Sequence, residues 1–408
     1  TVNGAVTSVN YGDADKVAKV EFTGGTVTGE LDTRSYDPTT GKLTSITDVA
    51  KSTIKVTGGT FSSDPTKYVV ESSAATKNEN GTYDVAKAFL AQVGETSYYT
   101  LPEAVAAAQN GETVTLLKNV TENVTIPAGK TITLDLDGKK LTVPTDVGIL
   151  VKGKLTVTGN GTVTCDRTPF KVDAGELVIE NGTVNSDSDY GIYAKDGGSV
   201  TVNGGTLTSL YSPLTGNNTT GNMNFTVNGG TLTAKSGPAI YMPGQVSLTI
   251  TDGTLNGGIS LRMGQVNISG GTINAVTNNI GSPKDNSNYS GNAWLPDALY
   301  VFGGTYTSED SHGNSLNLNI TGGTFTCAND QGSAVAIYDL GKVEQEMNVT
   351  ISGEAKLSTN GTSRGAYDVL SLTDIGVTNP APGFGVNSGN VNTAITGGLF
   401  TSDPSAYC

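Results

Sequence analysis

The stretch VTVNGGTL, residues 200–207, decides the fold, because close copies of it recur along the chain. In each copy, apolar and polar residues alternate, a glycine pair or a similar bend follows, and a threonine and an apolar residue come next. The alternation predicts a half-buried β-strand, and the glycines supply the positive φ of a tight bend before a second strand. Further copies are LTVTGNGTV (155–163), LVIENGTV (177–184), FTVNGGTL (225–232), LTITDGTL (248–255), VNISGGTI (266–273) and LNITGGTF (318–325).

The spacing of the copies indicates one coil of a solenoid per copy. The threonine after the bend falls at positions 162, 183, 206, 231, 254 and 272, at intervals of 18 to 25 residues. A third short apolar strand precedes each copy, as in GIYA (191–194) and ALYV (298–301). Three strands and three bends in about 20 residues predict an all-β fold, a right-handed parallel β-helix. The alternative is a left-handed coil with a hexapeptide period, which the variable interval disfavours.

One short α-helix is predicted near residues 100–109. Thr100 and Glu103 form a capping-box pattern, and Leu101 and Val105 share one face of the helix. Because this segment comes just before the first coil, we expect it to cap the open end of the β-helix, where strand edges would otherwise be unpaired.

The two ends of the chain carry the same phrase. GGTFSSDPTKYV (58–69) and GGLFTSDPSAYC (397–408) align without a gap at an offset of 397 minus 58, or 339 residues. This match predicts that residues 1–71 are the terminal coils of a preceding β-helix unit, that 72–96 form a linker and a strand pair, and that 97–408 are one β-helix unit. Alternatively, residues 1–71 are extra coils of the same solenoid.

Composition excludes several classes of partner and site. The chain has 408 residues and 38 acidic against 24 basic side chains, and its formal net charge of -14 would repel nucleic acid. No apolar run approaches the twenty or so residues of a membrane-spanning helix. Three cysteines and a single histidine, without CxxC spacing, make a zinc site improbable and give no disulfide framework.

A longer stretch carries a family resemblance. The run QVGETSYYTLPEAVAAAQNGETVTLLKNVTENVTIPAGKTITLDLDGKKLT (92–142), together with the GGTFSSDP phrase, resembles large surface proteins of anaerobic Gram-positive gut bacteria, of the pectin-lyase-like β-helix superfamily. The resemblance implies a location outside the cell or on the bacterial surface, beside neighbouring repeat units of a longer protein. That superfamily holds polysaccharide lyases, glycoside hydrolases and adhesins, so the resemblance does not select a function.

Few residues suit catalysis. Members that resemble polygalacturonases carry a paired Asp-Asp and a Gly-His-Gly, because glycoside hydrolysis needs two carboxyl groups. The sequence has no Asp-Asp pair, and its nearest histidine motif is Ser311-His312-Gly313 in a polar segment. We therefore assign no catalytic residue and no required cofactor.

Calcium is the one cofactor for which the sequence offers candidates. Asp166, Asp173, Asp187 and Asp189 lie on successive predicted coils, and Asp166 and Asp187 are one coil apart. Carboxylates converging at one edge could hold Ca²⁺, as in relatives that resemble pectate lyases. The alternative is that each aspartate accepts backbone hydrogen bonds at a bend.

Tyrosines offer the stronger surface feature. Tyr193, Tyr241, Tyr300 and Tyr338 occupy the same place in the GIY, AIY, ALY and AIY strands, directly after an apolar residue that should face the core. Strand alternation therefore predicts an outward row of rings that could bind sugars through their apolar C–H faces. The alternative is that each ring packs beneath a neighbouring loop.

The longest interruption of the repeat, residues 275–297, contains Trp294, the only tryptophan. Loops inserted into solenoids often carry function, so Trp294 either stacks on a ligand or anchors the loop. Taken together, these features predict a non-catalytic protein that is secreted or lies on the cell surface and acts as an adhesive stalk. Our hypothesis is that it binds a polysaccharide or a host glycan. The alternative is a polysaccharide lyase or glycoside hydrolase.

Overall fold

A computed structural model describes residues 1–10, 19–45, 54–144, 148–216, 223–275, 295–302, 315–339, 346–371, 373–374 and 391–408. The chain divides into two compact units. The first comprises Thr1–Ala107 with Leu116–Thr121, and the second comprises Ala108–Thr115 with Glu122–Cys408.

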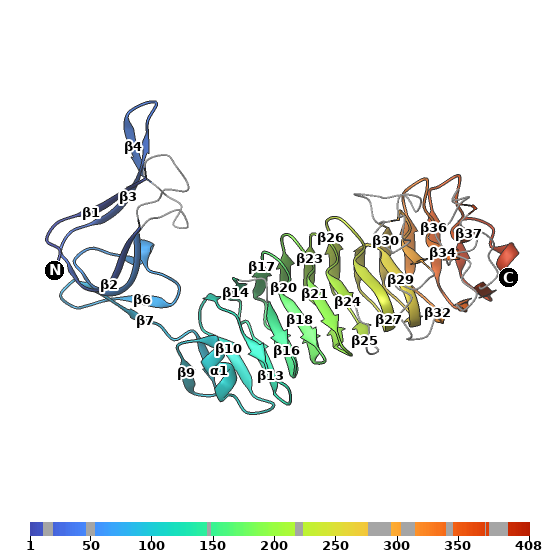
Figure 1. Cartoon of the computed structure of the whole chain (residues 1–408), viewed down its shortest axis with the longest axis horizontal. Coiled ribbons are helices and arrows are strands. Elements are labelled where there is room, and N and C mark those ends of the chain that lie inside the picture. The colour runs from blue at the N-terminus through green and yellow to red at the C-terminus, as the bar shows by residue number, and fades with distance from the viewer. Residues whose placement is uncertain are drawn as a thin grey trace. The chain divides into compact units, whose positions relative to one another are not determined.

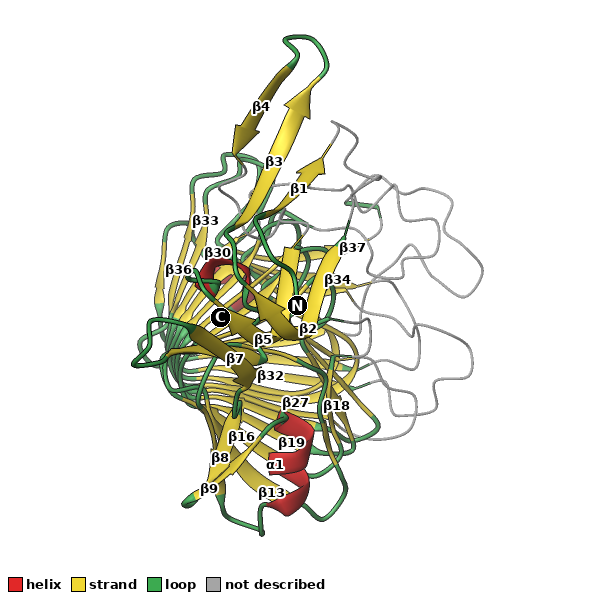
Figure 2. Ribbon diagram, turned by 90° about the vertical axis from the view of Figure 1, so that its left-hand side faces the viewer, coloured by secondary structure: helices red, strands yellow, loops and turns green. Residues whose placement is uncertain are grey.

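The second unit is a parallel β-helix, as the sequence predicts. Its strands follow one another coil by coil in three stacks (Figure 1), and Figure 2 shows strands such as β30, β33 and β36 one behind the next. Two stacks belong to one 21-stranded sheet, because β27 and β29 each run through both of them, and the third stack is an 11-stranded sheet.

The bounds of the strands follow the predicted phrases. At the boundary of the two units lie β10 (Thr113–Leu116) and β11 (Val120–Thr121). The first stack contains β12 (Thr125–Ile126), β15 (Ile149–Val151), β18 (Phe170–Asp173), β21 (Ile192–Lys195), β24 (Leu214–Gly216), the start of β27 (Ile240–Ile250) and of β29 (Ile259–Ile268), β31 (Leu299–Phe302), β34 (Val335–Asp339) and β37 (Tyr367–Ser371). The second stack contains β13 (Thr131–Asp135), β16 (Lys154–Thr158), β19 (Glu176–Ile179), β22 (Ser199–Val202), β25 (Met223–Val227), the ends of β27 and β29, β32 (Leu316–Ile320), β35 (Met347–Ile351) and β38 (Val391–Ile395). The third contains β14 (Lys140–Val143), β17 (Thr162–Cys165), β20 (Thr183–Ser186), β23 (Thr206–Ser209), β26 (Thr231–Ala234), β28 (Thr254–Gly257), β30 (Thr272–Ala275), β33 (Thr324–Cys327), β36 (Lys356–Thr359) and β39 (Leu399–Phe400), followed by the 3-10 helix η4 (Ser405–Tyr407).

The threonines after the bends stack on one another. Thr162 pairs with Thr183, and the column continues in register through residues 206, 231, 254, 272 and 324. Coils of 18 to 25 residues therefore keep one register because the extra residues fall in the bends, where insertion does not disturb the ladder.

The core is a continuous apolar column inside the coils. On the first stack, Phe170, Ile192, Leu214 and Ile240 are in register and fully buried. Each column of this kind removes apolar surface from water along the whole stack, which stabilises the β-helix at about 25 cal/mol per Å².

The first unit contains shorter stacks of its own. Strand β2 (Val20–Val27) pairs in parallel with β5 (Ile54–Phe61), and β1 (Val6–Asn10) pairs in parallel with β3 (Leu31–Asp37), which also pairs with β4 (Lys42–Ser45). Parallel pairing at offsets of 25 and 34 residues resembles the coil of the second unit. That residues 1–71 end a preceding β-helix stays a prediction.

Part of the segment expected to be a linker forms strands. Strands β6 (Ser73–Lys77) and β7 (Tyr83–Lys87) form an antiparallel hairpin, and β7 also pairs with β5. The polar Asn-rich sequence forms the turn of this hairpin rather than a spacer, because alternation on either side of it allows strand pairing. Strands β8 (Ala91–Val93) and β9 (Thr96–Tyr98) form a second antiparallel pair around Gly94.

The single predicted helix is present as α1 (Leu101–Ala107). The amide of Glu103 donates to Thr100 Oγ1 at 3.2 Å, which satisfies one of the free donors of its first turn. Leu101, Ala104 and Val105 are buried, and α1 packs beside β8 and β9. Its role as a cap stays a prediction. No helix among the described residues has the length and apolar character needed to cross a membrane.

Candidate functional site

The outer side of the first stack carries most of the candidate binding residues. Tyr193 lies in register with Lys171 and Thr215, Thr215 with Tyr241, and Tyr241 with Ser260, which pairs with Tyr300. The prediction that these tyrosines share one outward column is confirmed for three of the four.

Tyr338 does not belong to this column. Val335 pairs with Leu299 and Ala336 with Tyr300, so Tyr338 lies opposite Phe302, two residues further along the strand. Aligning the two strands by the similar tripeptides AIY and ALY gave the wrong register, because register is set by the whole ladder rather than by one tripeptide.

Three of the four rings that could have formed an exposed row are buried, as the alternative supposed. Tyr241 is 7% exposed, and Tyr300 and Tyr338 are each 1% exposed. Burial raises the pKa of the Tyr300 phenol, which hydrogen-bonds with the Ser260 side chain and the Leu295 backbone. These rings point outward from the strands but are not open to solvent, so they offer no platform for a sugar.

Tyr193 differs from its column partners, because it is half-buried and lies in a group of three tyrosines. Its ring centroid is 6.2 Å from that of Tyr190, whose centroid is 6.0 Å from that of Tyr211. Tyr211 is 37% exposed, and Tyr190 is half-buried. We call Tyr190, Tyr193 and Tyr211 the tyrosine cluster. It joins adjacent coils, since Tyr190 and Tyr193 flank the start of β21 and Tyr211 lies between β23 and β24.

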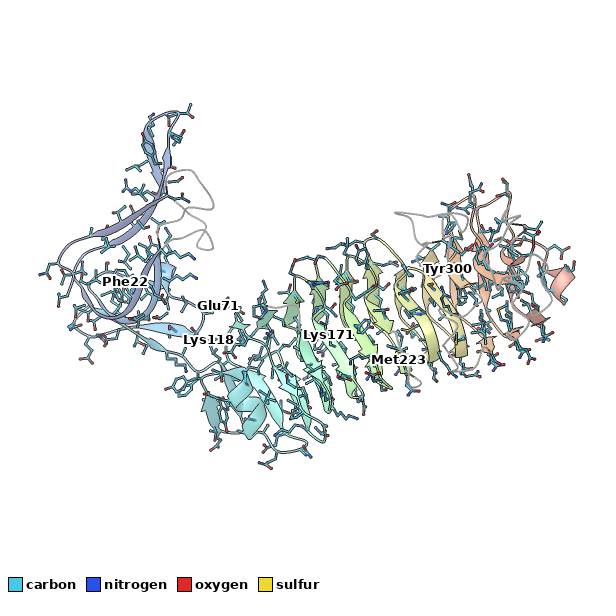
Figure 3. All side chains as sticks on the ribbon, in the orientation of Figure 1. Phe22, Glu71, Lys118, Lys171, Met223 and Tyr300 are labelled. Atoms are coloured by element: carbon cyan, nitrogen blue, oxygen red, sulfur yellow. The ribbon has the colours of Figure 1, made fainter. Side chains whose placement is uncertain are left out.

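An ion pair and a backbone hydrogen bond lie beside the tyrosine cluster. Lys195 Nζ lies 3.3 Å from Asp173 Oδ1, two residue pairs along the strands from Lys171 and Tyr193. On the other side, Tyr211 N donates to the carbonyl of Asp189. Figure 3 labels Lys171 on this part of the stack, with Tyr300 further along it. Aromatic rings with adjacent hydrogen-bonding groups are the usual lining of sites for polar ligands that have an apolar face.

The predicted convergence of aspartates does not occur. Among the residues that the structure describes, no group of three His, Cys, Asp or Glu side chains is placed to hold a metal ion. Asp173 lies on β18 between Lys152 and Lys195, whereas Asp187 pairs with Lys235 at 3.8 Å. These two carboxylates are neutralised by lysines of other coils.

The remaining two aspartates lie at the bend that leads into the first stack. Asp189 Oδ2 accepts a hydrogen bond from Thr168 Oγ1 at 3.1 Å and lies 3.8 Å from Arg167 Nε. Asp166 is exposed, and its carbonyl accepts from the Ser188 amide. The Asp189 carboxylate thus contacts side chains of the preceding bend. That these aspartates accept backbone hydrogen bonds through their carboxylates stays a prediction.

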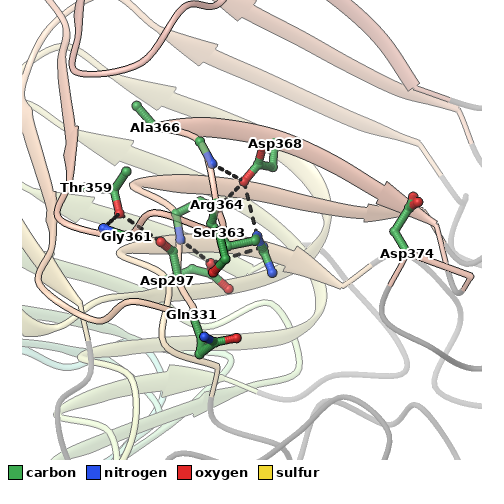
Figure 4. A network of polar contacts seen from close by, with 12 residues as sticks. Asp297, Gln331, Thr359, Gly361, Ser363, Arg364, Ala366, Asp368 and Asp374 are labelled. Atoms are coloured by element: carbon green, nitrogen blue, oxygen red, sulfur yellow. Dashed lines mark hydrogen bonds and ion pairs between the residues drawn. The ribbon is translucent and has the colours of Figure 1, made fainter.

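A buried polar network lies further along the same side of the stack (Figure 4). Asp297, just before β31, is fully buried; its Oδ2 accepts from the Tyr338 hydroxyl at 2.7 Å and its Oδ1 from the Ser333 amide at 2.7 Å. Arg364 lies between Asp297 Oδ1, at 3.5 Å, and Asp368 Oδ2, at 3.1 Å. We call Asp297, Tyr338, Arg364 and Asp368 the acid network.

The acid network holds three successive coils together. Asp368 Oδ2 also accepts from Ser333 Oγ at 2.6 Å and from the Gly365 amide at 2.8 Å. Burial raises the pKa of the Asp297 carboxyl to about 6, although Arg364 and the two hydrogen bonds act in the opposite direction. A carboxyl with such a pKa is a candidate general acid, but both of its oxygens are already occupied by protein donors and neither is open to solvent.

Sequence reasoning missed most of the acid network. Asp297 and Arg364 lie outside the repeated phrases, and the signals were a Pro-Asp before an apolar strand and an Arg-Gly before another. Arg262, also buried, lies instead within the strand β29. Trp294 and His312 lie outside the described residues.

Comparisons of the chain with models of protein families, with curated proteins and with solved structures found no match.

Proposed function

We propose that the chain is a non-catalytic, extracellular β-helical stalk of the pectin-lyase-like type, and that its tyrosine cluster binds polysaccharide. The observation that carries the proposal is the cluster of Tyr190, Tyr193 and Tyr211, partly exposed and with the ion pair of Lys195 and Asp173 beside Tyr193. A location on the bacterial surface rests on the sequence resemblance alone.

The role of a stalk is supported by the continuity of the stack. Backbone ladders join every described coil of the second unit to the next, and polar side chains repeat the ladder outside. Asn228 Nδ2 donates to Asn203 Oδ1 at 2.9 Å, and Asn228 Oδ1 accepts from Thr251 Oγ1 at 2.9 Å. Such an array resists bending, because each described coil is hydrogen-bonded to its neighbours in all three strand stacks.

Binding of sugars is supported by the chemistry of the cluster. Tyrosine faces stack against the apolar C–H face of a sugar ring, and the hydroxyls of the sugar need donors and acceptors at its edge. Lys195 and Asp173 supply both kinds of group beside Tyr193. A shallow site of this kind binds weakly alone, so useful affinity would come from several sites acting on one polymer.

One observation favours the competing enzyme class. Asp297 combines burial, a pKa of about 6 and an arginine neighbour, which are features of acid catalysts in carbohydrate-cleaving enzymes. We favour a structural role for Asp297. A general acid must reach the glycosidic oxygen of its substrate, and Asp297 is fully buried.

The test is to incubate the protein with uronate-containing and neutral polysaccharides and to record both retention and new reducing or unsaturated ends. Retention without cleavage supports the proposal, and cleavage overturns it. Tyr211→Ala should reduce retention, whereas Tyr99→Ala, which removes a comparably exposed ring outside the cluster, should not. Equal retention by both variants would show that the tyrosine cluster is not the binding site for polysaccharide.

A further inference from the structure

The repeated phrase at the two ends of the chain folds in the same way. GGTF at the end of β5 is followed by the 3-10 helix η2 (Thr66–Tyr68), and GGLF, whose last two residues form β39, is followed by η4. In both, the aspartate before the proline receives a hydrogen bond at 2.9 Å from the amide two residues later, Asp64 from Thr66 and Asp403 from Ser405.

In both copies, one edge of the strand pairs in parallel with the preceding coil. Phe61 of β5 pairs in parallel with Val27 of the preceding coil, and Phe400 of β39 pairs in parallel with Leu357. The two strands therefore occupy equivalent places, each as the last parallel strand of its stack.

The other edge differs between the copies. The outer edge of β5 pairs with the antiparallel strand β7, with Gly59 opposite Val85 and Phe61 opposite Tyr83, and β6 completes the hairpin. Within the described part of the chain, no strand pairs with the corresponding edge of β39.

The side chains reflect this difference. Phe61 is fully buried in the first copy, whereas its equivalent Phe400 is half-exposed. Leu399 is 67% exposed, more than any other large apolar side chain in the described residues. The backbone of β39 is exposed as well. Leu399 N and Thr401 N donate to the preceding coil, so strand alternation points the amide of Phe400 at the free edge.

We propose that the free edge of β39 is a docking site for an antiparallel β-hairpin of the β6–β7 type. A free edge of a flat stack is a template for another strand, and the chain itself shows the partner that this phrase accepts. The hairpin closes the stack of β39 as β6 and β7 close that of β5.

Within the GGTF and GGLF segments the two copies differ in one position, Thr60 against Leu399, which bears on the chemistry of the partner. In the first copy, Thr60 Oγ1 donates to Asp84 of β7 at 2.7 Å. Leu399 replaces this threonine and cannot make that bond. The strand that docks on β39 therefore carries an apolar residue at the place of Asp84, where it covers Leu399.

The test extends the full chain after Cys408 with the sequence of residues 70–88, which reproduces the order found after residue 69. Hydrogen exchange of the Phe400 amide is the readout. We expect exchange to slow by about tenfold or more in the extended chain, because the amide gains a partner. An extension that carries Val85→Pro is the control, since proline removes a donor and prevents pairing.

Three outcomes decide the proposal. Slower exchange with the plain extension but not with the proline extension supports it, and a further slowing when the extension carries Asp84→Val supports the apolar partner. Unchanged exchange, or equal slowing by both extensions, overturns it. In the unextended chain, protection of the Phe400 amide could increase with protein concentration. That result would assign the edge to a second copy of the chain and would also overturn the proposal.

Discussion

The hydroxyl of Tyr338 donates to Asp297 Oδ2 at 2.7 Å, which joins β34 to the segment that leads into β31 on the preceding coil. Arg364 NH2 reaches the same tyrosine oxygen at 3.2 Å from a third coil. The outer side of the β-helix is therefore braced here by buried side chains, in addition to the backbone ladders.

Loss of this hydroxyl should destabilise the β-helix. We expect Tyr338→Phe to lower the free energy of unfolding by about 1 to 3 kcal/mol, because a buried carboxylate oxygen loses its donor. Urea denaturation measures the change. Tyr211→Phe is the matched control, since a partly exposed phenol should contribute within about 0.5 kcal/mol. Identical unfolding of the two variants would show that the bond is not stabilising.

Asp297 should make stability depend on pH. Burial raises its pKa to about 6 in the folded chain from the 3.8 of an exposed aspartate, so the folded chain holds the proton more tightly than the unfolded chain. Its contribution to the free energy of unfolding should therefore decrease as pH rises from about 4 to about 6, by at most about 1.4 kcal/mol per pH unit, and stay level above that range.

The comparison of wild type with Asp297→Asn isolates this effect, because the amide keeps the shape of the side chain but does not titrate. The difference between their free energies of unfolding, measured by urea denaturation from pH 4 to pH 8, should change only below about pH 6. A difference that is constant over the whole range would contradict the raised pKa.

The bends should be sensitive to a single methyl group where coils are close together. Gly230 has φ 83°, and a Cβ placed there would lie 2.8 Å from the Gly205 carbonyl oxygen. Gly129 has φ 77° but no atom within 4 Å of such a Cβ. Gly230→Ala should therefore lower the free energy of unfolding by about 1 to 3 kcal/mol more than Gly129→Ala. Equal losses would mean that the coils separate without strain.

Half-buried and fully buried tyrosines of one column should respond differently to truncation. Tyr193→Ala should reduce polysaccharide retention, since the ring belongs to the tyrosine cluster. Tyr300→Ala should instead destabilise the fold by about 3 to 5 kcal/mol, the range for large buried aromatic side chains. Thermal melts and retention on a polysaccharide column separate the two effects. Loss of retention without loss of stability in Tyr300→Ala would contradict this assignment.

The sequence by itself determined the coil. Alternation, the glycine bends and the returning threonine are local and periodic, so the strands and their stacking follow from each phrase and its neighbours. The register of Thr162, Thr183 and Thr206 could be predicted from their spacing alone. The short helix was equally predictable, because its cap and its apolar face lie within ten residues.

Only the tertiary structure decided which outward residues are accessible and which polar groups meet. Tyr193 and Tyr300 have the same place in similar strands, yet one is half-buried and the other fully buried. Exposure depends on what else lies over a strand, and Asp297 meets Arg364 across 67 residues of sequence. A repeat pattern fixes the direction of a side chain from its own strand, but it carries no information on what packs against that side chain from distant parts of the chain.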